Sequence, residues 1–550
     1  MHVTPISKRP AGKVRRAIAV AGLLAVGLVV RPGASEPPQA TTATATATTN
    51  GSGATATAAS ATATAASATA TVSVAAPVLD GAKVRAAVAD LVSDAKGWGG
   101  TAGAMVLEVE SGAVVAAAEE HAVVNPASNA KLATAVAALR VLGPEHRFLT
   151  GLYGKVNGER VATLVLRGLG DPTLTSDDLA ALVRTLVERG VRKVGDVLVD
   201  QGYFDDTFTP PAFAQQPNEW APFRAPVSAV AVDANTVLVT ARPSEDGKPA
   251  RVTVSPPGVG VVSGTVRTTK KDDPEKLGVS MAVGGATGAA AGGSATGGAA
   301  GGGLSIKVSG HVPEGGGVVT VARRLEDPRL SGGLALRAAL VAAGIEVSGE
   351  VRRGGEKEKG LLAAHRSDTL AHVLARLGKD SDNFVAEMVF KALGAEKARP
   401  GTFAGAAEVV TAELRALGAF EPGCLVVNGS GLFDANRTTA AATATLLRRG
   451  YLDSKVGPEL VAHLSVGGVD GTLRSRFKGW AKERAVRAKT GTLNATFALS
   501  GYVLGPPGRP TVAFALFVNG APGKAGAARA KMDKVVDAVA RAQRVSTREP

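Results

Sequence analysis

Three short polar motifs in this 550-residue chain contain the residue types that a serine nucleophile needs. Ser128-Asn-Ala-Lys131 separates a hydroxyl from an amine by three residues, which on a helix leaves their Cβ atoms about 5–6 Å apart on one face. Ser381-Asp-Asn383 and Lys489-Thr-Gly491 follow later, and the patterns Ser-x-Asn and Lys-Thr-Gly each occur once in the chain. Together the three motifs indicate acyl transfer through a covalent serine intermediate.

The Ser-x-x-Lys spacing occurs three times, so its context must select the nucleophile. Ser93 lies at the end of a predicted helix, and Ser475 lies among basic residues without an apolar helix. Ser128 follows Asn125-Pro126 and opens an apolar helix predicted over 128–142. The N–H groups and dipole of that helix start would face a developing oxyanion. We therefore predict that Ser128 is the nucleophile.

The other predicted catalytic residues supply proton transfer. Lys131 is the base nearest to Ser128, and keeping a lysine amine neutral near pH 7 costs roughly 4.6 kcal/mol. We expect burial and the positive charge of Lys489 to offset this cost, because both disfavour the ammonium form. Ser381 is expected to relay a proton to the leaving amine, and Asn383 to hold the Lys131 ammonium or the substrate amide.

The residues from Lys489 to Thr492 are predicted to lie on a strand alongside the substrate. Lys489 and Thr490 would bind a terminal carboxylate, with Gly491 and Thr492 completing the substrate-binding strand. The N–H groups of Ser128 and Thr492 would form the oxyanion hole, where losing one donor typically costs about 2.7–4 kcal/mol.

Hydrophobic periodicity and turn residues predict the elements that position these motifs. The front of the chain reads as helix, hairpin and helix, and its end as strands followed by a helix. One antiparallel sheet would then be assembled from both ends of the chain, with helices against it. The predicted helices are 83–96, 128–142 and 525–544, and the predicted strands are 102–110, 113–119, 485–488, 495–504 and 511–519.

The middle of the chain must then be inserted into this α+β domain. We predict a split catalytic domain of residues 79–154 and 359–545, interrupted by a mainly β domain over 155–358. Short valine-bearing strands support the β assignment of the insert, at 162–167, 236–240 and 251–254. The Gly/Ala-rich tract from Gly284 to Gly303 is predicted to be a loop.

Residues 1–35 resemble a secretory signal, with basic residues before an uncharged apolar run of 14 residues from 17 to 30. A membrane span needs about 20 such residues, so cleavage is favoured, with a retained anchor as the alternative. Residues 36–78 are rich in Ala, Thr and Ser and predict a disordered tether. We expect export to the periplasm or cell-wall space.

The charged, cysteine and histidine residues limit the binding partners and metal sites that the chain is expected to have. Net charge is +14, but basic residues are scattered among acidic ones, which argues against nucleic-acid binding. Peripheral association with a membrane or an anionic wall polymer is left open. The single Cys424 precludes an intramolecular disulfide and is expected to be buried and unreactive. The histidines lack metal-ligand spacing, so no metal site is predicted.

The three motifs in this order resemble those of low-molecular-mass class C penicillin-binding proteins, the D-alanyl-D-alanine carboxypeptidase/endopeptidase family. Two features depart from it: the Gly284 to Gly303 tract, and Phe433-Asp434 after Leu432, where serine is commoner. Further segments that carry the resemblance are Pro126-Ala-Ser-Asn-Ala-Lys131, Gly170-Asp-Pro-Thr-Leu174, Val199-Asp200-Gln-Gly-Tyr203-Phe204, Asn428-Gly-Ser-Gly-Leu432 with Asn436-Arg437, and Gly468-Val-Asp-Gly-Thr-Leu473.

The resemblance implies a penicillin-recognising domain of the β-lactamase/transpeptidase-like type, interrupted by a mainly β insert and using no metal or organic cofactor. It implies cleavage of D-alanyl-D-alanine or D-alanyl cross-links in peptidoglycan stem peptides, with β-lactams as covalent inhibitors. Two alternatives stay open. One is a β-lactamase, although the chain has no Glu-x-x-Asn base motif, and the other is a non-catalytic wall-binding protein.

Overall fold

The computed structural model describes residues 79–283, 303–355 and 360–544. The predicted signal (1–35) and tether (36–78) lie outside these residues, as does all of the Gly/Ala-rich tract except Gly303. None of the helices within the described ranges is long and apolar enough to span a membrane.

A six-stranded antiparallel sheet organises the catalytic part in the order β17-β18-β19-β20-β1-β2. Strand β1 pairs with β20 along its whole length, from Thr101 opposite Asn519 to Glu108 opposite Val512, so both ends of the chain build one sheet. This arrangement confirms the predicted α+β class. The strands are β1 (Thr101–Glu108), β2 (Val114–Ala118), β17 (Ser465–Val466), β18 (Val486–Leu493), β19 (Thr496–Val503) and β20 (Val512–Asn519).

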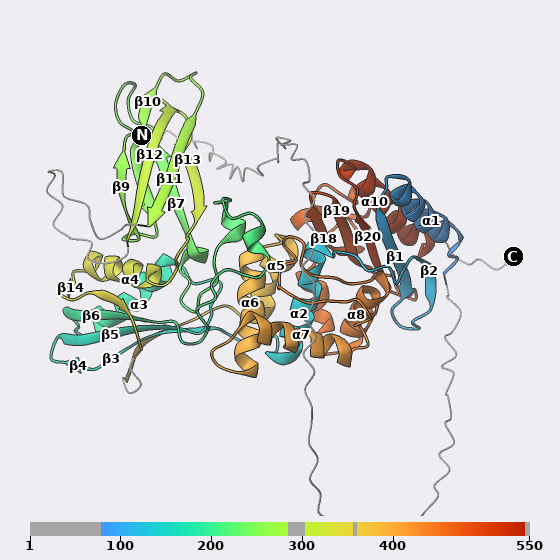
Figure 1. The fold of residues 1–550 in the computed structure, drawn as a ribbon, viewed down its shortest axis with the longest axis horizontal. Helices are drawn as coiled ribbons and strands as arrows, with labels where there is room; N and C mark the ends of the chain where they lie inside the picture. The colour runs from blue at the N-terminus through green and yellow to red at the C-terminus, as the bar shows by residue number, and fades with distance from the viewer. Residues whose placement is uncertain (1–78, 284–302, 356–359, 545–550) are drawn as a thin grey trace, which may run out of the picture. The chain divides into compact units, whose positions relative to one another are not determined.

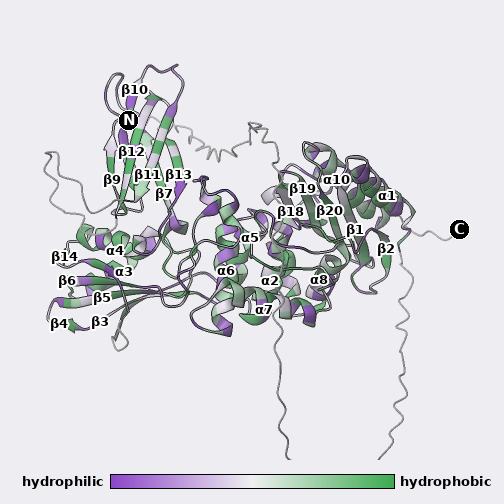
Figure 2. Cartoon of the chain, viewed as in Figure 1, coloured by the Kyte–Doolittle hydropathy of each residue, from purple (hydrophilic) through white to green (hydrophobic). Residues whose placement is uncertain are grey.

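Helices cover both faces of this sheet. Helices α1 (Ala82–Gly97) and α10 (Ala525–Ala542), from opposite ends of the chain, lie side by side against one face (Figure 1). They bury Leu91, Val535 and their neighbours against the sheet. Strands β19, β20 and β1 are mostly hydrophobic, as expected for strands covered on both faces (Figure 2).

The opposite face holds the helices that carry two of the three motifs. Helix α8 packs on β20 and β1, while α6 contacts α2, α5 and α7. Residues 384–395 of α6 are all buried, which is typical of a helix enclosed by other helices. These helices are α2 (Ala130–Val141), α5 (Leu370–Lys379), α6 (Asn383–Lys397), α7 (Phe403–Ala416), α8 (Ala440–Leu452) and α9 (Gly457–His463).

The segment predicted as the insert supplies most strands of a seven-stranded mixed sheet, which is covered by α3 (Ser176–Glu188) and α4 (Ser331–Ala342). Strands β3 and β16 pair with each other, so this sheet extends beyond the predicted insert of 155–358 on both sides. Composition marks no boundary there, because the pairing joins strands that are far apart in sequence. The strands are β3 (Leu149–Gly154), β4 (Val156–Asn157), β5 (Arg160–Gly168), β6 (Lys193–Asp200), β14 (Glu346–Val347), β15 (Val351–Arg353) and β16 (Gly360–Arg366).

The remaining strands of the predicted insert form a three-stranded and a four-stranded sheet. The first half of β12 alternates buried and exposed residues, so one face of that strand packs on a core while the other meets solvent. The strands are β7 (Thr236–Arg242), β8 (Arg251–Ser255), β9 (Gly260–Gly264), β10 (Arg267–Thr269), β11 (Lys276–Val283), β12 (Leu304–Pro313) and β13 (Val319–Arg324).

A buried lysine on α6 forms contacts with the segment predicted as the insert. The Lys391 side chain is fully buried and forms an ion pair of 2.6 Å with Asp205, which follows β6. Its Nζ also donates to the Thr207 carbonyl at 2.7 Å, and it faces the rings of Phe204 and Phe403. The insert and the catalytic helices therefore share one buried electrostatic contact.

Replacing Lys391 with methionine removes the buried member of an ion pair and leaves the partly exposed Asp205 without that partner. We expect Lys391→Met to cost about 1–3 kcal/mol of unfolding free energy, measured by chemical denaturation, because the remaining carboxylate can still reach water. The matched control is Lys397→Met on the same helix, where the lysine and its partner Glu408 are both largely exposed. Equal destabilisation by the two substitutions would contradict this account.

Candidate active site

The predicted nucleophile lies at the start of α2. Ser128 is in a 3-10 turn, η1 (Ala127–Asn129), that runs directly into the helix. The Lys131 Nζ donates a hydrogen bond of 3.1 Å to Ser128 Oγ. Lys131 is fully buried whereas Ser128 is partly exposed, so the hydroxyl can meet a substrate while the amine is shielded from water.

Backbone strain is concentrated at this turn. Ala127 has a φ of +46°, a left-handed conformation that costs a non-glycine residue about 1–3 kcal/mol. Two glycines allow neighbouring segments to press against it. A Cβ on Gly431 would lie 1.8 Å from the Ala127 carbonyl oxygen, and one on Gly491 would lie 3.0 Å from the Pro126 carbonyl oxygen. Gly491 therefore acts by leaving room for the turn.

The second motif forms the junction between α5 and α6. Ser381 is also left-handed, with a φ of +59°, and Asp382 caps α6 by accepting from the Val385 N–H at 3.1 Å. Asn383 is the first residue of α6, and its Oδ1 accepts a hydrogen bond of 2.7 Å from Lys131 Nζ. Helix α6, buried from residue 384 to residue 395, thus fixes the position of the amide beside the base.

The third motif lies on β18, which contacts the turn that contains Ser128. The buried Lys489 donates from Nζ to Ser381 Oγ and to the Thr490 carbonyl, each at 2.8 Å. Thr490 Oγ1 donates at 2.9 Å to Thr472, in the turn η5 (Gly471–Leu473), and Thr492 is exposed. The five predicted catalytic residues form two hydrogen-bonded groups. One is Ser128, Lys131 and Asn383, and the other is Ser381 and Lys489.

Burial controls the electrostatics of both lysines. It lowers the pKa of Lys131 to about 7, against the opposing negative charges of Glu387 and Asp382. Burial, followed by the charge of Lys131, holds the pKa of Lys489 well below its ordinary value. Repulsion between two positive charges is mutual, so each ammonium disfavours the charged form of the other. A lysine with a pKa near 7 is matched to base catalysis at neutral pH.

The insert also reaches this site. Asn383 Nδ2 donates to the Phe223 carbonyl at 3.3 Å, and Phe223 lies in the turn η3 (Pro222–Arg224) of the insert. This contact could not be predicted from the sequence, because the acceptor is a backbone carbonyl and no pattern of side chains indicates it. It links the insert to a predicted catalytic residue.

Two further residues at the site were missed. Lys131 Nζ donates to the Ser430 carbonyl at 2.7 Å. Ser430 belongs to the segment Asn428 to Leu432, which carries part of the family resemblance but had no predicted role. Glu387, one helical turn after Asn383, accepts from the backbone N–H of Ser430 at 2.8 Å. The signal for Glu387 was an acidic residue in an otherwise apolar stretch, on the same helix face as Asn383.

The other two Ser-x-x-Lys pairs assemble no comparable site. Ser93 is exposed at the end of α1, and Lys96 forms an exposed ion pair with Glu119. Ser475 and Lys478 are both exposed.

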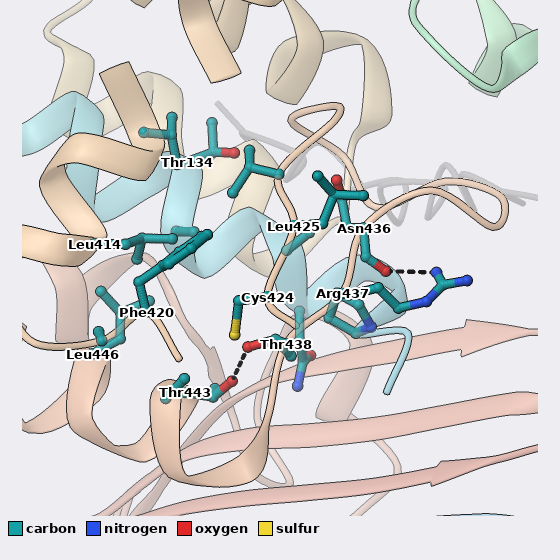
Figure 3. Close-up of a pocket in the computed structure, with 18 of the residues that line it drawn as sticks. Thr134, Leu414, Phe420, Cys424, Leu425, Asn436, Arg437, Thr438, Thr443 and Leu446 are labelled. Atoms are coloured by element: carbon teal, nitrogen blue, oxygen red, sulfur yellow. Dashed lines mark hydrogen bonds between the residues drawn. The ribbon is translucent and has the colours of Figure 1, made fainter. Parts of the chain in front are cut away.

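A separate cavity of about 40 Å³ lies beside α2, lined largely by apolar side chains (Figure 3). Thr134, Leu414 and Phe420 line it, but Ser128, Lys131 and Lys489 do not, so it is distinct from the hydrogen-bonded groups above. Cys424 also lines this cavity, and burial raises the pKa of its thiol. Such a thiol has little thiolate at neutral pH and is therefore a weak nucleophile.

Comparison with known proteins identifies related sequences over most of the chain. The D-alanyl-D-alanine carboxypeptidase of Actinomadura sp. (strain R39) is 33% identical over 447 residues, which cover 78% of this chain and 79% of that protein. D-alanyl-D-alanine carboxypeptidase DacB of Haemophilus influenzae is 27% identical over 408 residues, which cover 72% of this chain and 80% of the relative.

A solved structure shows the same fold. The crystal structure of penicillin binding protein 4 (dacB) from Haemophilus influenzae matches with a TM-score of 0.65 at 23% identity, covering 82% of this chain and 99% of that chain. The sequence profile of one peptidase family matches residues 84–542, from α1 to α10. The chain therefore belongs to the D-Ala-D-Ala carboxypeptidase 3 (S13) family.

Proposed function

We propose that this chain is a serine-type D-alanyl-D-alanine carboxypeptidase that forms its acyl-enzyme on Ser128 and also cleaves D-alanyl cross-links. Membership of the family supports the reaction class. The assignment of the nucleophile rests on one observation: the buried Lys131 amine lies 3.1 Å from Ser128 Oγ. Peptidoglycan stem peptides are the substrates, and β-lactams acylate the same serine.

Acylation begins with proton transfer. The neutral Lys131 amine accepts the Ser128 proton while Ser128 Oγ bonds to the carbonyl carbon of the penultimate D-alanine. The N–H groups of Ser128 and Thr492 stabilise the oxyanion of the tetrahedral intermediate. Asn383, at 2.7 Å from Lys131 Nζ, stabilises the ammonium that forms.

Collapse of the intermediate breaks the carbon–nitrogen bond. Ser381 donates its hydroxyl proton to the leaving amine, and Lys489, at 2.8 Å from Ser381 Oγ, returns a proton to the serine. The leaving amine belongs to terminal D-alanine in the carboxypeptidase reaction and to the neighbouring stem peptide in the endopeptidase reaction. Thr490 binds the terminal carboxylate. Lys131 then releases the Ser128 proton to solvent and Lys489 takes one up, so both amines regain their starting states. Water attacks the ester, and Lys131 accepts the proton of that water and returns it to Ser128 Oγ as the ester bond breaks.

Ser128→Ala is expected to abolish D-alanine release from uncross-linked muropeptides and cleavage of cross-linked dimers, because both reactions need the same acyl-enzyme. Chromatography of the products measures both activities. The control is Ser475→Ala, which removes another Ser-x-x-Lys serine from an exposed site and should leave both unchanged. Unchanged D-alanine release by Ser128→Ala would disprove the proposed nucleophile.

The lifetime of the penicillin adduct on the wild-type chain distinguishes a peptidase from a β-lactamase. We expect labelled penicillin to form a long-lived adduct on Ser128, identified by mass spectrometry of the tryptic peptide. The reason is that the chain has no Glu-x-x-Asn base motif for rapid deacylation. Rapid release of hydrolysed penicillin would instead favour the β-lactamase alternative.

The rate of acylation should depend on pH through Lys131. Its pKa is lowered to about 7, so the amine is protonated and inactive as a base below that pH and neutral above it. The second-order rate constant for penicillin acylation should therefore rise about tenfold per pH unit below about pH 6 and level off above about pH 8. A midpoint near the ordinary lysine value would refute this role of Lys131.

We also propose that the chain is exported to the periplasm or cell-wall space. The basic start and the 14-residue apolar run support a cleaved signal, and peptidoglycan is an extracytoplasmic substrate. Expression of the full chain should give an extracytoplasmic product whose mass lacks roughly 35 residues. Full-length protein in the cytoplasm would contradict export, and full-length protein in the membrane would contradict cleavage.

A further inference from the structure

Glu387 is a buried acid for which the proposed reaction has no role. Its residue exposure is 1%, and it lies on α6 one turn after Asn383. A buried carboxylate is costly unless several donors satisfy it, so the groups that surround Glu387 indicate what it stabilises.

Two of these donors belong to one loop. The Glu387 oxygens accept from the backbone N–H groups of Gly429 at 3.1 Å and Ser430 at 2.8 Å. The carbonyl oxygen of the same Ser430 accepts from Lys131 Nζ at 2.7 Å. A single peptide segment thus connects the carboxylate on α6 to the amine on α2.

Uncharged contacts hold the loop elsewhere. Asn436 Oδ1 accepts from the N–H groups of Val427 at 2.7 Å and Asn428 at 3.1 Å, and Thr134 Oγ1 donates to the Gly429 carbonyl at 2.8 Å. Asn436 and Thr134 also line the neighbouring cavity (Figure 3). Glu387 adds a charge to this set of contacts.

The charged groups that face Lys131 come from two elements. Glu387 and Asp382, on and at the start of α6, raise the Lys131 pKa against the effect of burial, and Lys489 on β18 is coupled to Lys131. Asp382 is partly exposed and pairs with Arg376 at 2.9 Å. Burial raises the pKa of Glu387, whereas its hydrogen bonds to the loop and the charge of Lys131 oppose that effect.

We propose that Glu387 is a positioning residue for Lys131: it fixes the Ser430 carbonyl against the amine and favours the ammonium that forms when Ser128 loses its proton. This inference rests on the proposed function, in which Lys131 is the base. Glu387 acts through the loop and its charge, and it contacts neither the substrate nor Ser128.

The test is the pH profile of acylation by labelled penicillin in Glu387→Gln. The glutamine removes the charge and one acceptor for the loop, and both changes disfavour the ammonium. We expect the midpoint to fall by about half a pH unit or more and the rate constant on the plateau to fall about tenfold. The rate constant for adduct formation is independent of the fraction of protein that is folded.

Glu396→Gln is the matched control, because it makes the same substitution at an exposed position of the same helix and should leave the profile unchanged. Glu387→Asp keeps the negative charge on a shorter side chain. Its acylation profile should therefore have a midpoint pH near the wild-type value and a plateau rate constant below the wild-type value. This second variant still tests the inference if Glu387→Gln fails to fold.

The two proposals fail in different ways. If the wild-type chain forms no adduct on Ser128, the proposed function is wrong. If the wild-type chain is acylated and Glu387→Gln is slower by one factor at every pH, or unchanged, the role given to Glu387 is wrong. It is equally wrong if Glu387→Asp shows the wild-type rate constant on the plateau.

Discussion

The burial of one lysine amine constrains the whole active site. A buried amine needs acceptors for its hydrogens, and Lys131 finds them in Ser128, Asn383 and the Ser430 carbonyl. These acceptors come from the start of α2, the start of α6 and a loop before α8. The sheet, the buried helix α6 and the loop must therefore all be in place before the amine is satisfied. The same burial brings its pKa to about 7, so the contacts that hold the lysine also prepare it for chemistry.

Backbone strain in the site follows the same logic. Ala127 and Ser381 both adopt left-handed conformations that side chains disfavour, and each lies at or beside a predicted catalytic serine. Surrounding structure holds them there. Gly431 lets its segment approach the Ala127 turn more closely than any residue with a Cβ would allow, and a Cβ on Gly491 would make a tight contact of 3.0 Å with the Pro126 carbonyl oxygen. The motif glycine therefore contributes to the site through packing as well as through its place on the substrate strand.

Local sequence patterns predicted the elements around the first and third motifs, because helix and strand periodicity depends on neighbouring residues. No element was predicted around Ser381 to Asn383, where the structure has α5 and α6. The predicted helix over 128–142 corresponds to η1 and α2, and the strand over 511–519 corresponds to β20. The insert boundaries could not be predicted in this way. Strands β3 and β16 belong to one sheet only through their mutual pairing, which composition does not encode.

The predicted site residues lie together, but part of what holds them was invisible in the sequence. The Phe223 carbonyl is a backbone group, which leaves no residue-type signal. Glu387 stands out as an acid in an apolar stretch, but its partners are backbone N–H groups of a loop that is distant in sequence. The size of the pKa shift of each lysine was also beyond the sequence, because it depends on the burial of both amines and on the acids nearby. Those quantities exist only in the folded chain.

The account depends most directly on the protonation of Lys131 in the free enzyme. Titration of isotope-labelled lysine side chains by NMR, with the Lys131 signal assigned by its loss in Lys131→Arg, measures it without a substrate. The account predicts a pKa of about 7. A value near 10.5, the ordinary value for lysine, would contradict it, because an amine protonated at neutral pH could not take the proton of Ser128.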